Sequence, residues 1–329
     1  MKKLKFKIIL FIFLLSVFGC DENPTENVND ERYGKVYVTS NIENAEIFLD
    51  DKTTNKFTPD TITALATGYI VKVRKFGYFS DKQKIIFDEN KIQTLELSLI
   101  KNELRKNVLL ENFTNVNCFD CIESNRIINE LKTTYGNSLF PINYHYEFPS
   151  SSDPFYNEAK TTIDERAIYY GVFETPNIFL DGSRNTSVND KNMLNENIES
   201  ELTKLTSFEI NVQDSVLNKN GFNVAVFVDV FDTDNINFNS LFLQIVLVEK
   251  NIQFSDAPGT SGEKEFTNVM RAMLPKNNGR SLSAIDKNGR YKYFEFISLN
   301  PLWNTDNLFV VTFIQDNLSK KVLHVGSSE

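Results

Sequence analysis

Residues 108–121, VLLENFTNVNCFDC, decide the fold of the central part of this 329-residue chain. Val108–Leu110 open an apolar strand, and Cys118 and Cys121 follow it with two residues between them. A helix-like stretch comes next and ends at Gly136-Asn137. Its apolar side chains fall on one side: Ile127, Ile128, Leu131 and Tyr135. The pattern predicts a strand, a Cys-x-x-Cys turn and a helix.

The residues that follow continue this alternation of strand and helix. Phe140–His145 has the composition of a second strand, and Glu158–Tyr170 that of a second helix. Residues 175–182, TPNIFLDG, predict a turn, a strand and a turn. We therefore expect an α/β domain over residues 106–205.

The two cysteines suit thiol chemistry. The N-terminus of a helix carries partial positive charge and free N–H groups, which favour a thiolate at Cys118. Such a thiolate attacks a disulfide, and Cys121 then resolves the mixed disulfide. The pattern predicts Cys118 as the catalytic nucleophile and Cys121 as the resolving residue.

A strand, a Cys-x-x-Cys helix and a later Thr-Pro strand together resemble the thioredoxin fold. The resemblance implies that Pro176 is cis and lies beside the dithiol, so that Thr175 and Pro176 bind the substrate strand. Three positions depart from the family pattern. Asn112 replaces a buried Asp, Asn117 replaces a Trp, and Asp120 places a negative charge inside the motif. These departures predict a slow or specialised dithiol.

Other roles for the motif remain open at the sequence level. It also suits an inert structural disulfide. Zinc requires four ligands, and His145 is the only further candidate nearby, so we expect no metal site. Ile122 excludes a c-type haem, because that attachment motif has His at this position. The sequence predicts no cofactor.

The segment before this unit predicts a small β-sandwich over residues 34–101. Short alternating strands occur there, with a Thr58-Pro59 turn and no helical period. Residues 34–51, GKVYVTSNIENAEIFLDD, followed by TP, GYIVKV and KFGY, resemble a PEGA domain. Ile42 stands where that family has Pro, and Asn44 where Gly is common, although Asn tolerates a left-handed turn. The segment suits a spacer or a binding module.

Residues 206–329 predict a C-terminal β-sandwich domain. Alternate apolar residues of 222–230 form one face of a long strand, and Leu241–Val248 is a nearly continuous apolar run. The long segment Asn251–Thr267 suits either a binding loop or a mobile one. Several motifs recur in an order similar to the lipoprotein family named for a 28-kilodalton outer membrane protein: VLLENFTNVNCFDC, DPF, TPNIFLDG, LVEKNI, NVMRAML and NLFVVTFIQDNLSKKVL. That resemblance implies a thioredoxin-like domain followed by a β domain at the outer membrane.

The N-terminus predicts export. Four lysines precede the apolar run Ile8–Phe18, which is too short to span a bilayer. Gly19-Cys20 then resembles the lipobox of bacterial lipoproteins, which implies removal of residues 1–19 and lipid on Cys20. An ordinary signal peptide or an uncleaved anchor is the alternative. Residues 20–33 are acidic and suit a flexible tether or a surface-export signal. With Cys20 lipidated, Cys118 and Cys121 form the remaining disulfide pair.

Composition limits the partners. The chain is 41% hydrophobic and 24% charged, which is ordinary for a folded domain. After residue 19 it carries 31 basic and 44 acidic side chains, which argues against a nucleic-acid partner. We expect an outer-membrane lipoprotein that faces the periplasm or the cell surface and contacts exported proteins or other thiols. The first hypothesis is thiol–disulfide exchange, and the alternative is a non-enzymatic binding or structural lipoprotein with a degenerate thioredoxin-like core.

Overall fold

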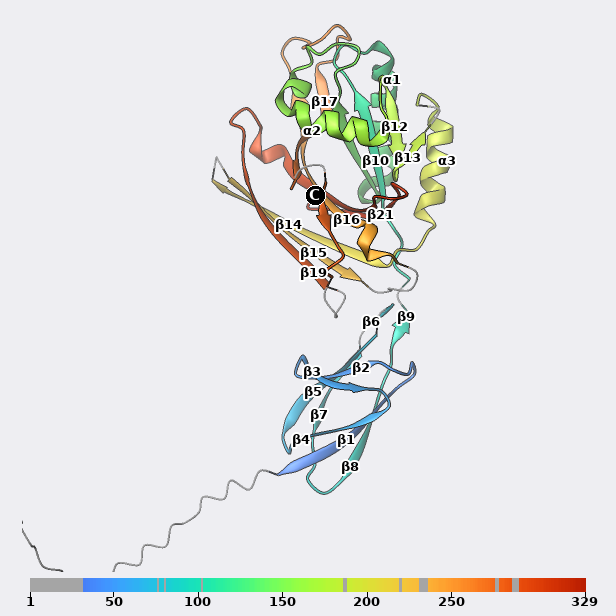
Figure 1. The fold of residues 1–329 in the computed structure, drawn as a ribbon, viewed down its shortest axis with the longest axis vertical. Coiled ribbons are helices and arrows are strands. Elements are labelled where there is room, and N and C mark those ends of the chain that lie inside the picture. Colours follow the sequence, from blue (N-terminus) through green and yellow to red (C-terminus); the bar gives the residue numbers. More distant parts are fainter. Residues whose placement is uncertain are drawn as a thin grey trace, which may run out of the picture.

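The computed structural model describes residues 32–75, 77–79, 81–101, 103–185, 188–218, 221–230, 236–275, 278–285 and 290–329. The expected signal segment, Cys20 and the tether as far as Glu31 lie outside these residues. The described chain is mostly β (Figure 1). Its α-helices are α1 (Phe119–Tyr135), α2 (Pro154–Tyr170) and α3 (Lys191–Leu202). Short 3-10 turns occupy Gly136–Ser138, Phe238–Ser240 and Thr305–Asn307.

The N-terminal unit is a small sandwich of two sheets around one apolar core. One sheet has the order β4-β1-β8, and the other β3-β2-β5-β7. Val36 and Val38 of β1 meet Ile47 of β2 and Val71 of β5 in this core. The strands are β1 (Tyr33–Ser40), β2 (Glu46–Leu49), β3 (Lys52–Phe57), β4 (Asp60–Leu65), β5 (Gly68–Arg74), β6 (Tyr78–Phe79), β7 (Asp81–Ile86), β8 (Ile92–Leu97) and β9 (Ile100–Lys101).

Asn44 illustrates how the turn before β2 accepts a residue other than glycine. Its φ is 59°, inside the left-handed region that Asn tolerates, and its N–H donates to the Thr58 carbonyl at 2.8 Å. The sequence-based expectation for this position is confirmed. The turn therefore keeps its geometry without a glycine.

A nine-stranded sheet organises the rest of the chain. Its main order is β13-β12-β10-β11-β17-β16-β20-β21, and β18 pairs with β16. The strands β10 and β11 run parallel with Thr114 opposite His145, and β12 runs antiparallel to β10. The bounds are β10 (Val108–Thr114), β11 (Leu139–His145), β12 (Asn177–Leu180), β13 (Ser183–Asn185), β16 (Leu241–Gln253), β17 (Glu265–Leu274), β18 (Arg280–Ser281), β20 (Leu308–Asp316) and β21 (Val322–Ser327).

Alternating residues of β10 place the helices on opposite faces of this sheet. Val108 and Leu110 pack with α1 and α3, whereas Leu109 and Phe113 pack with α2. Period-two alternation in a buried strand thus produces two separate apolar layers.

The C-terminal region forms a sandwich, but it is not separate from the α/β part. A three-stranded sheet of β14 (Phe208–Asn218), β15 (Gly221–Val230) and β19 (Arg290–Ser298) packs its apolar face on β16 and β20. The strands β16 and β20 belong to the same nine-stranded sheet as β10. The expected boundary between residues 205 and 206 is therefore crossed by continuous strand pairing, because β11 pairs in parallel with β17 at Asn143 and Val269.

Buried charges join Lys106, at the beginning of the α/β part, to the residue after β12 and to α3. Lys106 Nζ lies 2.6 Å from Asp181 Oδ2 and 3.0 Å from Glu201 Oε2. Beside this cluster, the backbone N–H of Asn107 donates to His324 Nδ1 at 3.4 Å. Burial and the Lys106 charge lower the pKa of His324 to about 4. His324 is therefore neutral in the folded protein at neutral pH.

We expect this histidine to make the protein sensitive to acid. Between pH 6.5 and 4 this histidine binds a proton in the unfolded chain but not in the folded protein. The folded state therefore has its full stability above this window and loses stability as the pH falls through it. The loss is about 2 kcal/mol at pH 5. Urea unfolding at pH 7 and pH 5 measures it, and His324→Asn should reduce the difference by this amount.

Asp181 explains why the comparison with a variant is necessary. Burial raises the pKa of Asp181 to about 6 despite the neighbouring Lys106, which gives a pH dependence of opposite sign. Because wild type and His324→Asn share this contribution, their difference isolates the histidine. An unchanged pH dependence in the variant would contradict the assignment.

Candidate functional site

The two cysteines lie where the sequence predicts, at the N-terminus of α1. Cys118 is the N-cap residue, and the backbone N–H of Cys121 donates to its Sγ at 3.1 Å. The two sulfurs form a disulfide. Only 5% of Cys118 and none of Cys121 is exposed to solvent, so Cys118 is the sulfur that a partner reaches first. A thiolate released at Cys118 would keep the helix N–H as a hydrogen-bond donor.

Strand register brings the Thr-Pro turn to the same end of the sheet. Phe113 of β10 pairs with Asn177 of β12, so Pro176 falls opposite Thr114, just before the cysteine turn. The Thr175-Pro176 peptide bond is cis. Thr175 Oγ1 donates to the Phe148 carbonyl at 2.9 Å, which joins this turn to the loop after β11. Three loops therefore meet at this end of the sheet.

The loop between β16 and β17 is packed against the residues that precede Cys118. The Ser261 N–H donates to the Val116 carbonyl at 3.2 Å, and the Thr260 N–H to Asn117 Oδ1 at 3.0 Å. A β-carbon at Gly259 would lie 2.2 Å from the Val116 carbonyl oxygen, so the loop approaches this closely only with glycine there. The sequence left a binding loop and a mobile loop open, and the structure shows a loop anchored beside the disulfide.

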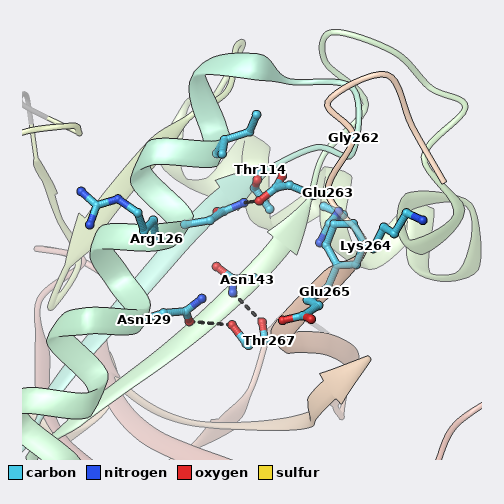
Figure 2. A pocket seen from close by; sticks show the side chains of 13 residues that line it. Thr114, Arg126, Asn129, Asn143, Gly262, Glu263, Lys264, Glu265 and Thr267 are labelled. Atoms are coloured by element: carbon cyan, nitrogen blue, oxygen red, sulfur yellow. Dashed lines mark hydrogen bonds between the residues drawn. The ribbon is translucent and has the colours of Figure 1, made fainter. Parts of the chain in front are cut away.

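This loop and α1 enclose a cavity of about 460 Å³ (Figure 2). Asn125 Nδ2 donates to Glu263 Oε1 at 3.2 Å, and Thr267 Oγ1 donates to Asn129 Oδ1 at 2.7 Å across it. Burial raises the pKa of Glu263. Figure 2 shows Arg126 and Lys264 pointing away from the cavity on its two sides. Ile122, which follows Cys121, also lines the cavity, so the disulfide and the cavity are neighbours.

A buried His–Asp pair supports the floor of the site. His145 Nδ1 lies 2.8 Å from Asp153 Oδ2, which also accepts the Val116 N–H at 2.9 Å. Asp153 Oδ1 caps α2 by accepting the N–H groups of its first residues. Burial acts to raise the pKa of Asp153, but His145 and these N–H groups hold it below its ordinary value. The carboxylate therefore orients the imidazole and fixes Val116.

Amide side chains surround Asn112, the residue expected at the position of the buried acid in thioredoxins. Asn112 Nδ2 donates to Asn143 Oδ1 at 2.8 Å and to Asn125 Oδ1 at 3.0 Å. An amide does not take up a proton at neutral pH, so Asn112 cannot serve as a proton acceptor for Cys121. The neighbouring Glu111 points to the opposite face, as strand alternation predicts, and is paired there with Arg166.

The sequence missed Asp153 as a partner of His145. A signal was present, because Asp153-Pro154 places a capping acid directly before a proline suited to the first helical turn. In the described ranges, no group of three or more His, Cys, Asp or Glu side chains could hold a metal ion. No helix in the same ranges is long and apolar enough to cross a membrane.

Two parts of the chain resemble known proteins. The family model of the PEGA domain matches residues 33–103, which confirms that expectation for the N-terminal unit. No curated protein matches the chain. Among solved structures, HBP35 of Porphyromonas gingivalis is 16% identical with a TM-score of 0.58, over 69% of this chain and 76% of that protein.

Two further solved structures are more distant. A protein from Agrobacterium tumefaciens is 10% identical, with a TM-score of 0.44, over 70% of this chain and 95% of its own. A domain of the outer membrane lipoprotein Omp28 from Porphyromonas gingivalis is 13% identical, with a TM-score of 0.27, over 38% and 88%. These two scores are too low to support a fold assignment. The chain thus contains a PEGA domain and, over 69% of its length, shares the fold of HBP35.

Proposed function

We propose that this chain is an envelope lipoprotein, tethered to the outer membrane by lipid on Cys20, whose thioredoxin-like unit exchanges disulfides with exported proteins through Cys118 and Cys121. The observation that carries the proposal is the placement of Cys118. It caps a helix, accepts an N–H at its sulfur, is disulfide-bonded to Cys121, and lies at the sheet end where the Thr175-Pro176 turn arrives. Thr175 and Pro176 would contact the backbone of the partner.

The exchange proceeds through a mixed disulfide on Cys118. A partner thiolate attacks Cys118 Sγ, and Cys121 leaves as a thiolate. A second thiolate of the partner then attacks the partner sulfur of the mixed disulfide, and Cys118 leaves as a thiolate. The partner gains a disulfide and this chain becomes a dithiol. The reverse direction passes through the same adduct, and in that direction an envelope thiol would have to supply the reduced pair.

Cys121→Ser should trap this adduct. Without the resolving sulfur, the mixed disulfide between Cys118 and a partner cysteine persists, in whichever direction it formed. Non-reducing gels of envelope extracts should then show high-mass species that disappear on reduction. The matched control is Cys118→Ser, which leaves only Cys121. Because Cys121 is fully buried, this variant should trap almost nothing. A folded, exported Cys121→Ser protein without adducts would exclude the exchange reaction.

A non-enzymatic binding role is the second candidate, favoured by the amides beneath the disulfide. The Asn112–Asn143 pair gives Cys121 no neighbouring acid, and both sulfurs are nearly inaccessible. In that case Cys118→Ser/Cys121→Ser would keep every partner that the wild type recovers and would lose only stability. A small disulfide ring contributes a few kcal/mol at most, about 3 kcal/mol or less. Loss of a partner by this double variant, with its fold intact, would argue against pure binding.

A further inference from the structure

The outward face of the sheet β14-β15-β19 carries a hollow that disulfide exchange does not use. The inward face of β15 packs Phe222, Val224, Val226 and Val228 against β16 and β20, so the alternate residues point outward. A cavity of about 760 Å³ lies on the sheet over residues 213–215, 223–225 and 294–296. Ala225, on the middle strand β15, is one of the residues that line it.

Strand register arranges the outward side chains in two rows across the sheet. In one row Ser215 pairs with Asn223, which pairs with Phe296. In the next row Gln213 pairs with Ala225, which pairs with Phe294. Each row therefore runs from a polar side chain on β14 to a phenylalanine on β19.

The two phenylalanines are unusually exposed for their size. Phe294 is 66% exposed and Phe296 52%, and their positions two residues apart on β19 place them about 7 Å from each other. Phe227 holds the Phe294 ring by an edge-to-face contact with centroids 5.9 Å apart. The rings thus form a short aromatic ridge beside amide and hydroxyl groups.

Two carboxylates border the hollow, Asp214 and Glu295, and both stand in register with the inward-facing Val224, so they lie on the opposite side of the sheet from Gln213, Ser215 and Asn223. Asp214 accepts a hydrogen bond from the Ser328 hydroxyl, and Glu295 accepts one from the Tyr293 hydroxyl. At the far end of the sheet Arg290 and Asp229 form an ion pair at 2.6 Å. In the described part of the chain, the side chains of Gln213, Ser215 and Asn223 make no hydrogen bond to another residue. Neutral donors and acceptors are therefore available next to the rings.

We infer that this face binds a neutral polysaccharide. A sugar ring presents an apolar C–H face that stacks on an aromatic ring and a rim of hydroxyl groups that both donate and accept hydrogen bonds. The ridge of Phe294 and Phe296 matches the first property, and Asn223 with Gln213 matches the second. An acidic glycan or an anionic lipid surface would need cations in the hollow, and none of the described residues that line it is a lysine or an arginine.

Native affinity electrophoresis tests the inference with the full chain in detergent. The gels contain a soluble β-glucan, an α-glucan, a galactomannan or a xylan, with polygalacturonate as the acidic comparison. We expect retardation by at least one neutral polymer. Phe294→Ala and Phe296→Ala should each weaken it by about three- to tenfold, and the double variant should lose it. Since both rings are exposed, neither change should alter thermal unfolding.

Phe57→Ala is the matched control. Phe57 is also 52% exposed but lies on β3 of the PEGA domain, so its loss should leave retardation unchanged. Retardation that survives the Phe294→Ala/Phe296→Ala double variant would overturn the inference. Retardation by polygalacturonate alone, or by none of the polymers, would overturn it as well.

Discussion

Glu111→Ala is expected to lower the free energy of unfolding by about 3–5 kcal/mol. Glu111 is completely buried on β10, and its two carboxylate oxygens accept the Arg166 Nε and Nη2 groups, each at 2.8 Å. Removal of the carboxylate leaves the Arg166 guanidinium buried without its counter-ion. Arg166 also donates to Gln315 Oε1 at 3.0 Å, so the disturbance reaches β20.

Urea unfolding of the variant and of a matched control decides the size of the effect. Glu123→Ala removes a carboxylate that also pairs with an arginine, Arg126, but on the exposed side of α1. We expect its unfolding midpoint to match that of the wild type. Glu111→Leu/Arg166→Met, which removes both charges, should be more stable than Glu111→Ala alone. A Glu111→Ala midpoint equal to that of Glu123→Ala would show that the buried pair is not needed.

Gly182→Ala is expected to cost about 3 kcal/mol or more. Gly182 forms the turn between β12 and β13 with a φ of +82°, a conformation that strains an alanine. A β-carbon there would also lie 1.8 Å from the Lys320 carbonyl oxygen, in the turn between β20 and β21. The two turns must separate, which breaks the contact between the first and last parts of the nine-stranded sheet.

Gly262→Ala separates the two causes of this cost. Gly262 has nearly the same φ, +84°, but nothing lies within 4 Å of its β-carbon position. This substitution should therefore lower the free energy of unfolding by only about 1 kcal/mol, the cost of placing an alanine at a positive φ. Thermal unfolding of both variants gives the difference that the collision at Gly182 causes. Equal losses would mean that the turns move apart without resistance.

Local patterns in the sequence predicted much of the fold because they depend on short-range rules. The apolar stretch before Cys118, the alternation that turns Glu111 away from the cysteines, and the left-handed Asn44 all follow from one strand or one turn. The two strands β14 and β17 were not predicted. Phe208, Ile210 and Val212 of β14 do alternate with polar residues, so a signal for this strand was present, whereas β17 begins within the stretch expected to be a loop.

Long-range pairing could not be deduced in the same way. Asn143 Nδ2 donates to the Thr267 carbonyl at 2.6 Å. Because 124 residues separate the two, no local pattern in the sequence indicates that β11 pairs with β17. The same reasoning applies to the cavity beside Cys121, which residues 262–267 close from a distant part of the chain. The sequence located the cysteines, and tertiary contacts determined what surrounds them.

The residues just before β10 are hydrogen-bonded to β21, the last strand of the nine-stranded sheet in chain order. The Lys106 ammonium donates to the Val322 carbonyl at 3.4 Å, and Asn107 Nδ2 donates to the Val325 carbonyl at 3.1 Å. A nascent chain whose residues 320–329 are still inside the ribosome lacks β21 and cannot make either bond. The α/β part therefore reaches its final form only after β21 has left the ribosome, whereas the core of the PEGA domain is built from its own residues and can form first.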